Sequence, residues 1–272
     1  MKDTLKKIFR PFVKNDLAWK ALKPLSSLGN FMQYERKLEE NKASFAHLFK
    51  DLRVQNGPFK GLQYPSLSAV GSALYPKLIG SYEQEIHNEV NELCDTDYVE
   101  VVNIGCAEGY YAVGMARRMP NTKIYAYDIS EKARNLCQQM ATLNGVGGRV
   151  LIGGEYTASD LAKRKFEGKA LIVCDCEGAE KDILTSENMG NLKDCDFLIE
   201  THDCIDITIS TYLQNLLKDT HDLQWVKSND DIEKAKTYNY KGTENLSLTD
   251  KWRLYGEGRV AIMEWIIARP KK

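Results

Sequence analysis

Apolar residues in this chain form short runs separated by stretches with helical spacing. The run at 98–104 is rich in β-branched side chains, which is typical of a strand buried on both faces. The chain then passes Gly105 and Gly109, and a helix-like stretch continues as far as Met119. Pro120 follows and cannot continue a helix. The pattern therefore predicts a strand, a glycine-rich turn and a helix.

The same alternation continues along the chain. Further strands are expected at 123–127, 149–153, 171–174, 197–200, 223–227 and 261–268. Helices are expected before the first strand, with Ser81 as the cap, and at 130–143 and 205–217. This order predicts an α/β domain on a mainly parallel sheet. The polar stretch 228–259 is expected to be a loop that forms a lid, selects substrate or is disordered.

The N-terminal part of the chain has a different pattern. Glycines and prolines at 55–65 indicate a boundary, so we expect a helical extension at 1–64 and the main domain at 65–272. A second helical stretch is expected at 31–50. A first helical stretch is expected near the N-terminus, where apolar residues at helical spacing stand among lysines and arginines. These apolar residues are Leu5, Ile8, Phe9, Phe12 and Val13. This first stretch is interpreted either as packing on the main domain or a second subunit, giving a homo-oligomer, or as lying on an anionic membrane.

Composition narrows the class of protein. The 272 residues are 43% hydrophobic with a net charge of -1, which supports a substantial core and disfavours broad nucleic-acid binding. Seven cysteines without paired spacing indicate reduced thiols. No apolar run is long enough to span a bilayer. We therefore expect a cytoplasmic protein that meets a membrane peripherally if at all.

The turn at 105–109 and the acid after the second strand suggest a nucleoside ligand. A dinucleotide site requires G-x-G-x-x-G, but the middle glycine is missing here, and Glu108 would oppose phosphates. A carboxylate suits a ligand with an ammonium and a sulfonium, and Asp128 suits a ribose diol. An ordinary strand-to-helix turn is the structural alternative. The stretch resembles the glycine motif of class I S-adenosylmethionine (SAM) methyltransferases.

The fourth strand ends in DCEGAE at 175–180, which resembles the FkbM-type family of these methyltransferases. The stretches at 75–87, 101–114 and 197–203 add to the likeness, which runs from Tyr75 to the end of the chain. Asn103 stands where the family usually has an acid, and Glu108 is expected to compensate. The resemblance implies a Rossmann-like class I sheet of seven strands, the last antiparallel. It also implies SAM as cofactor, bound by Asn103, Gly105, Glu108, Gly109, Tyr82, Asp128, Ile129, Glu155 and Asp175.

Three acids at the fourth strand's end are expected to lie near the reaction. Asp175 is assigned to the point of methyl delivery, and Glu177 or His202 to the general base. The structural alternative is that Glu177 and Glu180 lie at the start of a helix, where acids complement the helix dipole. A magnesium-dependent alternative uses Asp175, Glu200 and Asp203. Within the 228–259 loop, a further group is expected either to contact substrate or to be solvated, namely Trp252, Arg253, Tyr255 and Arg259.

The resemblance implies O-methylation of a hydroxyl on a small molecule or glycan. A sugar, nucleotide-sugar or glycan of capsule or polysaccharide biosynthesis is the first choice, and a polyketide or other small natural product is the alternative. Methylation of a planar nitrogen is disfavoured because the sequence after the fourth strand is Asp175-Cys176-Glu177 and not N-P-P-aromatic. A second alternative is a non-catalytic SAM-binding or scaffold protein.

Overall fold

The computed structural model describes residues 10–12 and 14–272, and its contacts divide the chain into two compact units, Met1–Lys50 and Asp51–Lys272. The smaller unit contains a 3-10 turn, η1 (Arg10–Phe12), and the helix α2 (Asp16–Phe45), which runs through Pro24. Asn15 caps α2 by accepting a hydrogen bond from the Ala18 N–H at 3.0 Å. Most of the helix expected over residues 5–13 lies outside the described residues.

The larger unit begins before the boundary expected at residue 65. Arg53 and Gln63 form an isolated antiparallel bridge, and the Val54 N–H donates to the Leu62 carbonyl at 2.9 Å. Buried apolar side chains also hold this segment, namely Val54, Phe59, Leu62 and Tyr64. By these contacts, residues 51–64 belong with the α/β domain, because the Gly- and Pro-rich stretch folds into a packed turn and not a linker.

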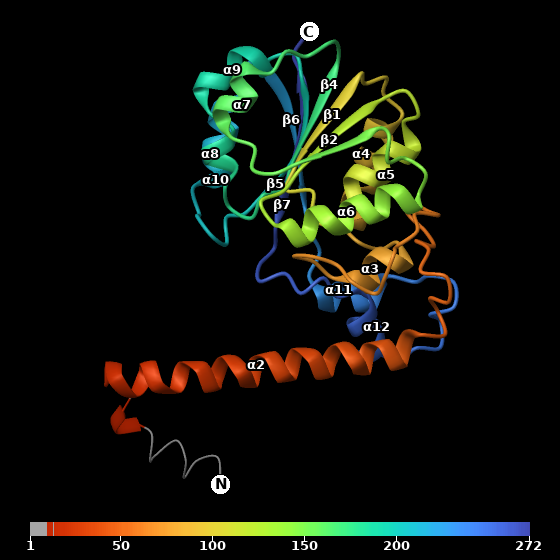
Figure 1. Cartoon of the computed structure of the whole chain (residues 1–272), viewed down its shortest axis with the longest axis vertical. Helices are drawn as coiled ribbons and strands as arrows, with labels where there is room; N and C mark the ends of the chain where they lie inside the picture. The colour runs from red at the N-terminus through yellow and green to blue at the C-terminus, as the bar shows by residue number, and fades with distance from the viewer. Residues whose placement is uncertain (1–9, 13) are drawn as a thin grey trace. The chain divides into compact units, whose positions relative to one another are not determined.

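Seven strands form one mixed sheet in the order β3-β2-β1-β4-β5-β7-β6 (Figure 1). Strands β1 to β5 are parallel, and β7 runs antiparallel between β5 and β6. The strands are β1 (Glu100–Ile104), β2 (Lys123–Tyr127), β3 (Val150–Gly153), β4 (Ala170–Cys174), β5 (Asp196–Thr201), β6 (His221–Lys227) and β7 (Glu264–Pro270). The expected Rossmann-like sheet of seven strands with an antiparallel last strand is confirmed. Its strand order reverses between β1 and β4, where open α/β sheets bind ligands.

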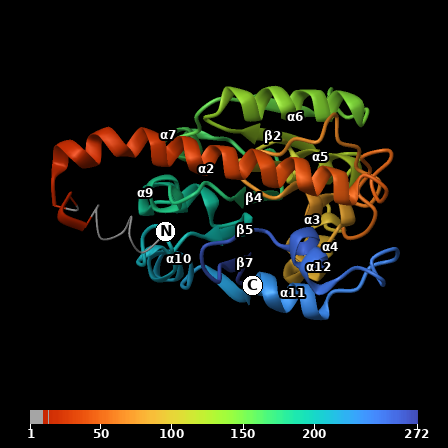
Figure 2. The ribbon, with the colours of Figure 1, turned by 90° about the horizontal axis from the view of Figure 1, so that it is seen from below.

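Helices cover both faces of this sheet (Figures 1 and 2). One face carries α4 (His87–Cys94), α5 (Tyr110–Arg118) and α6 (Glu131–Leu143). The other carries α7 (Ala158–Lys163), α8 (Glu180–Ile183), α9 (Ser186–Leu192) and α10 (Ile209–Leu217). On this second face, apolar side chains of β1, β4 and β5 and of the covering helices form one buried cluster, which includes Ile104, Ile172, Phe197 and, from α10, Leu213. Ser130 caps α6 as predicted, accepting from the Ala133 N–H at 3.3 Å.

The helix predicted after Ser81 is present, but Ser81 does not cap it. It consists of a 3-10 turn, η2 (Gln84–Ile86), that continues into α4, and it buries the predicted side chains of Ile86, Val90 and Leu93. A separate short helix, α3 (Leu74–Ile79), precedes it. Gly80 ends α3 with φ +83°, and a Cβ there would lie 2.2 Å from the Asn56 carbonyl oxygen. Ser81 Oγ is buried and has no hydrogen-bond partner among the described residues. This close backbone approach ends α3 before the next helix begins, and it cannot be recognised from an apolar period.

The stretch 228–259 is ordered into two short helices and is not one long loop. These are α11 (Asp231–Thr237) and α12 (Leu248–Tyr255). Asp230 caps the first by accepting from the Ile232 and Glu233 amides, and Ser247 caps the second. The caps were present in the sequence, but each helix is too short to show a clear apolar period.

Gly105 is required by the fold itself. Its φ is +80°, and a Cβ would lie 1.6 Å from the Asp175 carbonyl oxygen, so the turns after β1 and β4 touch through backbone. Gly105→Ala is therefore expected to lower the free energy of unfolding by roughly 2–5 kcal/mol, which combines left-handed strain with overpacking. Denaturant titration measures this loss.

Gly145→Ala is the matched control. Gly145 has φ +71°, and a Cβ added there would meet no heavy atom of the described residues within 4 Å. Only the left-handed strain remains, so the expected loss is roughly 1–2 kcal/mol. Equal losses for the two variants would contradict the backbone contact at Gly105.

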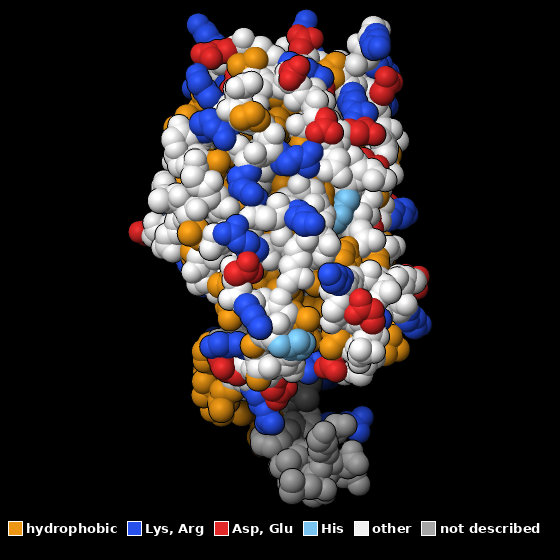
Figure 3. Space-filling view, turned by 90° about the vertical axis from the view of Figure 1, so that its right-hand side faces the viewer, with side chains coloured by type: hydrophobic (Ala, Val, Ile, Leu, Met, Phe, Trp, Pro, Cys, Tyr) orange, Lys and Arg blue, Asp and Glu red, His pale blue; other side chains and the backbone are white. Residues whose placement is uncertain are grey.

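On the face shown in Figure 3, acidic and basic side chains are interspersed. No helix among the described residues has the length and apolar character needed to cross a membrane.

Candidate active site

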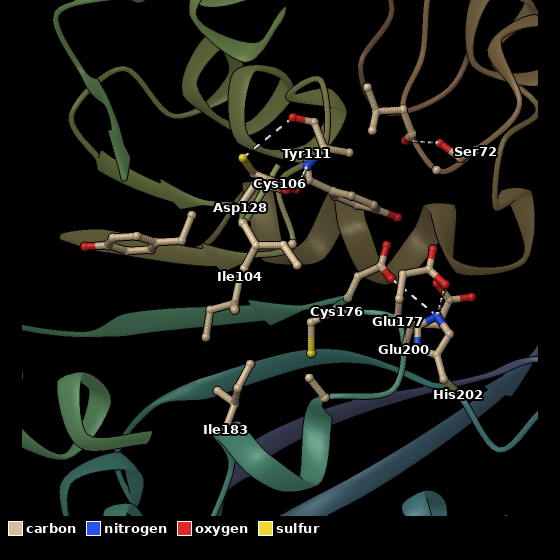
Figure 4. A pocket seen from close by; sticks show the side chains of 18 of the residues that line it. Ser72, Ile104, Cys106, Tyr111, Asp128, Cys176, Glu177, Ile183, Glu200 and His202 are labelled. Carbon is tan, nitrogen blue, oxygen red and sulfur yellow. Dashed lines mark hydrogen bonds and ion pairs between the residues drawn. The ribbon is translucent and has the colours of Figure 1, made fainter. Parts of the chain in front are cut away.

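A cavity of about 740 Å³ lies at the carboxyl ends of β1, β2, β4 and β5 (Figure 4). Residues 70–82 and 257–263 contribute other parts of its wall. Ligand pockets commonly measure about 300–1,000 Å³. The strand ends and following turns supply Ile104, Gly105, Cys106, Ala107, Tyr127, Asp128, Asp175, Cys176, Glu177, Glu200 and His202. The position follows from the sheet order, because the chain continues from β1 to α5 on one face of the sheet and from β4 to α8 on the other.

Asp128 is fixed by backbone donors from two segments. Its Oδ2 accepts from the Ala107 N–H at 2.9 Å, and its Oδ1 accepts from the Ser130 N–H at 2.8 Å. Ala107 has φ +47°, an uncommon conformation for a residue with a side chain, so this contact holds the turn in a strained shape. Each carboxylate oxygen keeps further acceptor capacity for a ligand hydroxyl.

Six of the nine residues assigned to cofactor binding line the cavity, namely Gly105, Tyr82, Asp128, Ile129, Glu155 and Asp175. The other three are not among the residues described along its wall. Asn103 is buried in β1, with its Oδ1 lacking a hydrogen-bond partner in the described chain. Gly109 faces protein, since a Cβ there would lie 2.9 Å from both Cys137 Sγ and Val113 Cγ2.

Glu108 is the third of these residues, and it is occupied by protein donors. Lys77 Nζ lies 2.6 Å from its Oε1, the Tyr64 hydroxyl donates to the same oxygen at 3.2 Å, and the Val70 N–H donates to Oε2 at 3.1 Å. Its charge is thus balanced inside the protein by Lys77, and not left free for a cationic ligand as we expected. No local pattern indicates this pair, because its members are 31 residues apart.

An aromatic wall was missed in the sequence. Tyr127 at the end of β2 and Tyr156 after β3 stack with ring centroids 4.0 Å apart and planes 23° apart. Both line the cavity near Ile129 and Glu155, which are exposed. An apolar, aromatic surface beside Asp128 suits a purine base attached to a ribose.

His202 is held by a carboxylate that sequence reasoning treated only as a helix-end acid. Its Nδ1 lies 2.7 Å from Glu180 Oε1. Its Nε2 lies 3.7 Å from Asp175 Oδ1 and 3.5 Å from Glu177 Oε2, both of which line the cavity. His202 is 3% exposed and Glu180 is fully buried. Glu180 therefore fixes the imidazole with Nε2 towards the cavity, as Figure 4 shows for His202 beside Glu177 and Glu200.

The pKa of His202 is raised above its usual 6.5. Burial is the largest influence and lowers it, but the hydrogen bond to Glu180 and the charges of Asp175, Glu180 and Glu177 together outweigh burial. Because the folded pKa exceeds the unfolded value, this group stabilises the fold fully below pH 6.5 and loses that contribution as pH rises through the folded pKa.

Glu180→Gln tests this coupling. Glutamine keeps an oxygen that can accept from Nδ1–H but removes the negative charge, so the pKa of His202 should fall. Proton NMR titration of the His202 ring measures the shift, and unfolding at a pH below 6.5 and at one well above it should show a smaller pH dependence than in the wild type. An unchanged His202 titration would contradict the pairing.

Arg259 links three segments of the chain by pairing with a buried carboxylate from each. It pairs with Glu200 at the end of β5, with Glu83 at 2.8 Å and with Glu257 at 2.8 Å. Burial is the main cause that raises the pKa of Glu83 to about 7. Burial, followed by the charge of Asp175, also raises the pKa of Glu200 well above its usual value. Acids outnumber cations at this end of the cavity, and Arg259 is already engaged by protein.

Four residues of the 228–259 stretch were expected either to contact substrate or to be solvated, and the structure places one of them at the cavity. Arg259 lines the cavity, whereas Tyr255 is fully buried and its hydroxyl lies 2.6 Å from Thr243 Oγ1. Trp252 and Arg253 are in α12, outside the described cavity wall.

The expected metal ligands are only partly brought together. Asp175, Glu200 and His202 each offer one ligand atom, and these atoms lie within 4.8 Å of one another. Asp203 instead binds the first turn of α10, where it accepts from the Ser210 N–H at 2.8 Å and from the Ser210 hydroxyl at 2.5 Å. The cluster fits Mg²⁺ poorly, because it includes an imidazole and Arg259 already neutralises Glu200.

The cavity wall as a whole is acidic. Its carboxylates are Asp128, Glu155, Asp175, Glu177, Asp182, Glu200 and Glu257. Its Lys and Arg side chains are Lys77, paired with Glu108, and Arg259, paired with three acids. Such a wall favours a cationic or neutral ligand over a phosphorylated one.

No protein-family model and no curated protein matches the chain. Among solved structures, the chain is similar to a precorrin-8w decarboxylase from Methanobacterium thermoautotrophicum, with 16% identity, TM-score 0.46, and 68% of this chain and 89% of that chain covered. It is also similar to a precorrin-6y C5,15-methyltransferase from Geobacter metallireducens, with 16% identity, TM-score 0.48, and 69% of this chain and 88% of that chain covered. For an rRNA methylase from Streptococcus thermophilus, the identity is 14% and the TM-score 0.44, with 69% of this chain and 97% of that chain covered.

Proposed function

We propose that this protein is a SAM-dependent O-methyltransferase in which the Glu180–His202 pair activates the acceptor hydroxyl. The observation that carries the proposal is the 2.7 Å contact between Glu180 and His202 Nδ1, with Nε2 directed at a cavity whose wall also contains Asp128. One end of the cavity thus has a candidate base, and the other has a carboxylate suited to a ribose.

The wall residues fit SAM better than a dinucleotide. Asp128 would accept hydrogen bonds from the ribose hydroxyls, and Tyr127 and Tyr156 would lie against the adenine. The acid-rich wall near Asp175 would favour the sulfonium and the ammonium, whereas a pyrophosphate would meet like charge. In this proposal Glu108 acts indirectly, because its pair with Lys77 holds the turn before α5 against residues 70–77.

When bound, SAM supplies a methyl group on a positively charged sulfur. A carbon-bound hydroxyl is a poor nucleophile, so the protein must take its proton as the new C–O bond forms. His202 Nε2 would accept that proton, while Glu180 holds Nδ1–H and stabilises the imidazolium. The raised pKa makes the neutral imidazole of His202 a stronger proton acceptor, which suits a general base. Asp175, which directly follows β4, would lie beside the reacting groups.

We propose a neutral sugar hydroxyl, free or in a glycan, as the acceptor. Exposed carboxylates on the wall, such as Glu177 and Asp182, can accept hydrogen bonds from sugar hydroxyls. The same charges disfavour a nucleotide-linked sugar, since Lys77 and Arg259 are both neutralised by protein acids. A polyketide hydroxyl remains the alternative acceptor.

The test is a screen of neutral sugars, glycans, nucleotide-sugars and polyketide alcohols with SAM, with and without EDTA. Mass spectrometry reads the gain of one methylene unit in the acceptor. We expect transfer to a neutral hydroxyl that EDTA does not reduce. Loss of transfer with EDTA would replace the His202 base with a metal, and SAM binding without transfer to any acceptor would support the scaffold alternative.

A further inference from the structure

The helix α2 carries a stripe of exposed apolar side chains. Ala21, Leu25, Leu28 and Met32 are four, three and four residues apart, which places them on one face of the helix. Leu25 is 64%, Leu28 53% and Met32 62% exposed. Further large apolar side chains exposed in α2 are Leu17, Trp19, Leu22 and Phe31. A soluble protein rarely leaves apolar surface of this kind exposed without a binding role.

The segment that contains this stripe is strongly basic. Residues 1–32 contain seven Lys or Arg and two Asp, a net charge of +5, so the rest of the chain carries -6. Between Leu17 and Met32 there is no acidic residue, while Lys20 and Lys23 are present. Arg10 and Lys14 precede the helix. The positive charge is therefore concentrated where the apolar side chains are exposed.

Charge decides between the candidate occupants of this face. A second copy of the helix would bring like charges together, and Pro24 would interrupt a regular seam between two helices. An anionic bilayer surface complements the positive charge and accepts the apolar face. Trp19 adds a side chain that favours the boundary between headgroups and acyl chains.

We infer that α2 is a membrane-binding helix that lies in the headgroup region of an anionic bilayer. Leu25, Leu28 and Met32 enter the acyl boundary, and Lys20 and Lys23 remain among the headgroups. This inference is independent of the proposed chemistry, because it uses no residue of the cavity. It implies that the protein works beside a membrane.

The test is sedimentation of the full chain with phosphatidylcholine vesicles, with or without phosphatidylglycerol. We expect binding to the anionic vesicles, weakened by added salt, and little binding to the neutral ones. Replacing both lysines, Lys20→Gln with Lys23→Gln, should weaken binding about 30-fold. The matched control, Lys163→Gln with Lys193→Gln on the larger unit, removes equal charge from exposed positions and should change binding little.

A second variant tests the apolar face. Leu25→Glu with Leu28→Glu should abolish vesicle binding, with circular dichroism used to verify that the helix content is retained. No binding of the wild type to anionic vesicles would overturn the inference, as would equal binding to neutral vesicles. A concentration-dependent dimer in analytical ultracentrifugation that this variant abolishes would also overturn it, in favour of a second copy.

Discussion

Replacing His202 with Asn is expected to lower kcat for methyl transfer by about 10²–10⁴-fold, the usual contribution of a general base. Asparagine retains a polar group near the position of Nδ1, where Glu180 needs a donor, but it has no counterpart of Nε2. The substitution therefore removes the proton acceptor without leaving the buried Glu180 wholly unpaired. SAM affinity, measured by calorimetry, should change little, because Asp128 and the aromatic wall are untouched.

Glu177→Gln provides the comparison, because Glu177 is the other candidate base. Its side chain is 66% exposed and its backbone has φ +54°, so its position depends on a strained turn. With His202 as base, this variant should keep transfer within about tenfold of the wild type. A larger loss for Glu177→Gln than for His202→Asn would reverse the assignment.

Asp128→Asn is expected to weaken SAM binding about 10- to 100-fold. A hydrogen bond to a charged group is worth roughly 1.5–3 kcal/mol, and the variant loses the charge that would bind the ribose. Its amide nitrogen must also face one of the two backbone donors that now reach the carboxylate, from Ala107 and Ser130. The turn after β1 should therefore loosen as well. Calorimetric titration with SAM measures the effect.

Asp182→Asn is the matched control for Asp128→Asn. Asp182 is also an acid of the cavity wall but is exposed, so its loss should change SAM affinity only slightly. Equal losses for the two variants would show that charge in general, and not the placement of Asp128, determines affinity.

The sheet could be predicted because its strands are separate apolar runs with turn residues between them. The strand β2 was predicted at its observed bounds, and β1, β4 and β5 to within two residues at either end. Asp128 and Asp175 could be placed at the cavity for the same reason, since each directly follows a strand. A position at the end of a parallel strand determines which edge of the sheet a residue reaches.

The side-chain partners could not be predicted, because apolar periodicity gives the buried face of an element and not the residue opposite. Arg259 meets Glu83 across 176 residues and Glu200 across 59. Glu180 meets His202 across 22 residues, from a helix of four residues. These pairs depend on which turns converge at the cavity, and no local pattern records that.

Two glycines of the turn after β1 have a packing role that was not predicted. Gly105 and Gly109 were interpreted as giving a ligand close access to the backbone. In the structure their missing side chains make room for the Asp175 carbonyl and the Cys137 side chain. The two glycines therefore let the turn after β1 pack closely against the residue that follows β4 and against α6.

The nature of the ligand is tested most directly by a calorimetric titration of the full chain with SAM, with NAD titrated in parallel. We predict saturable one-to-one binding of SAM and none of NAD, because the acidic wall favours a sulfonium and opposes a pyrophosphate. The absence of saturable SAM binding, or tighter binding of NAD, would contradict the proposal that this cavity holds a cationic methyl donor.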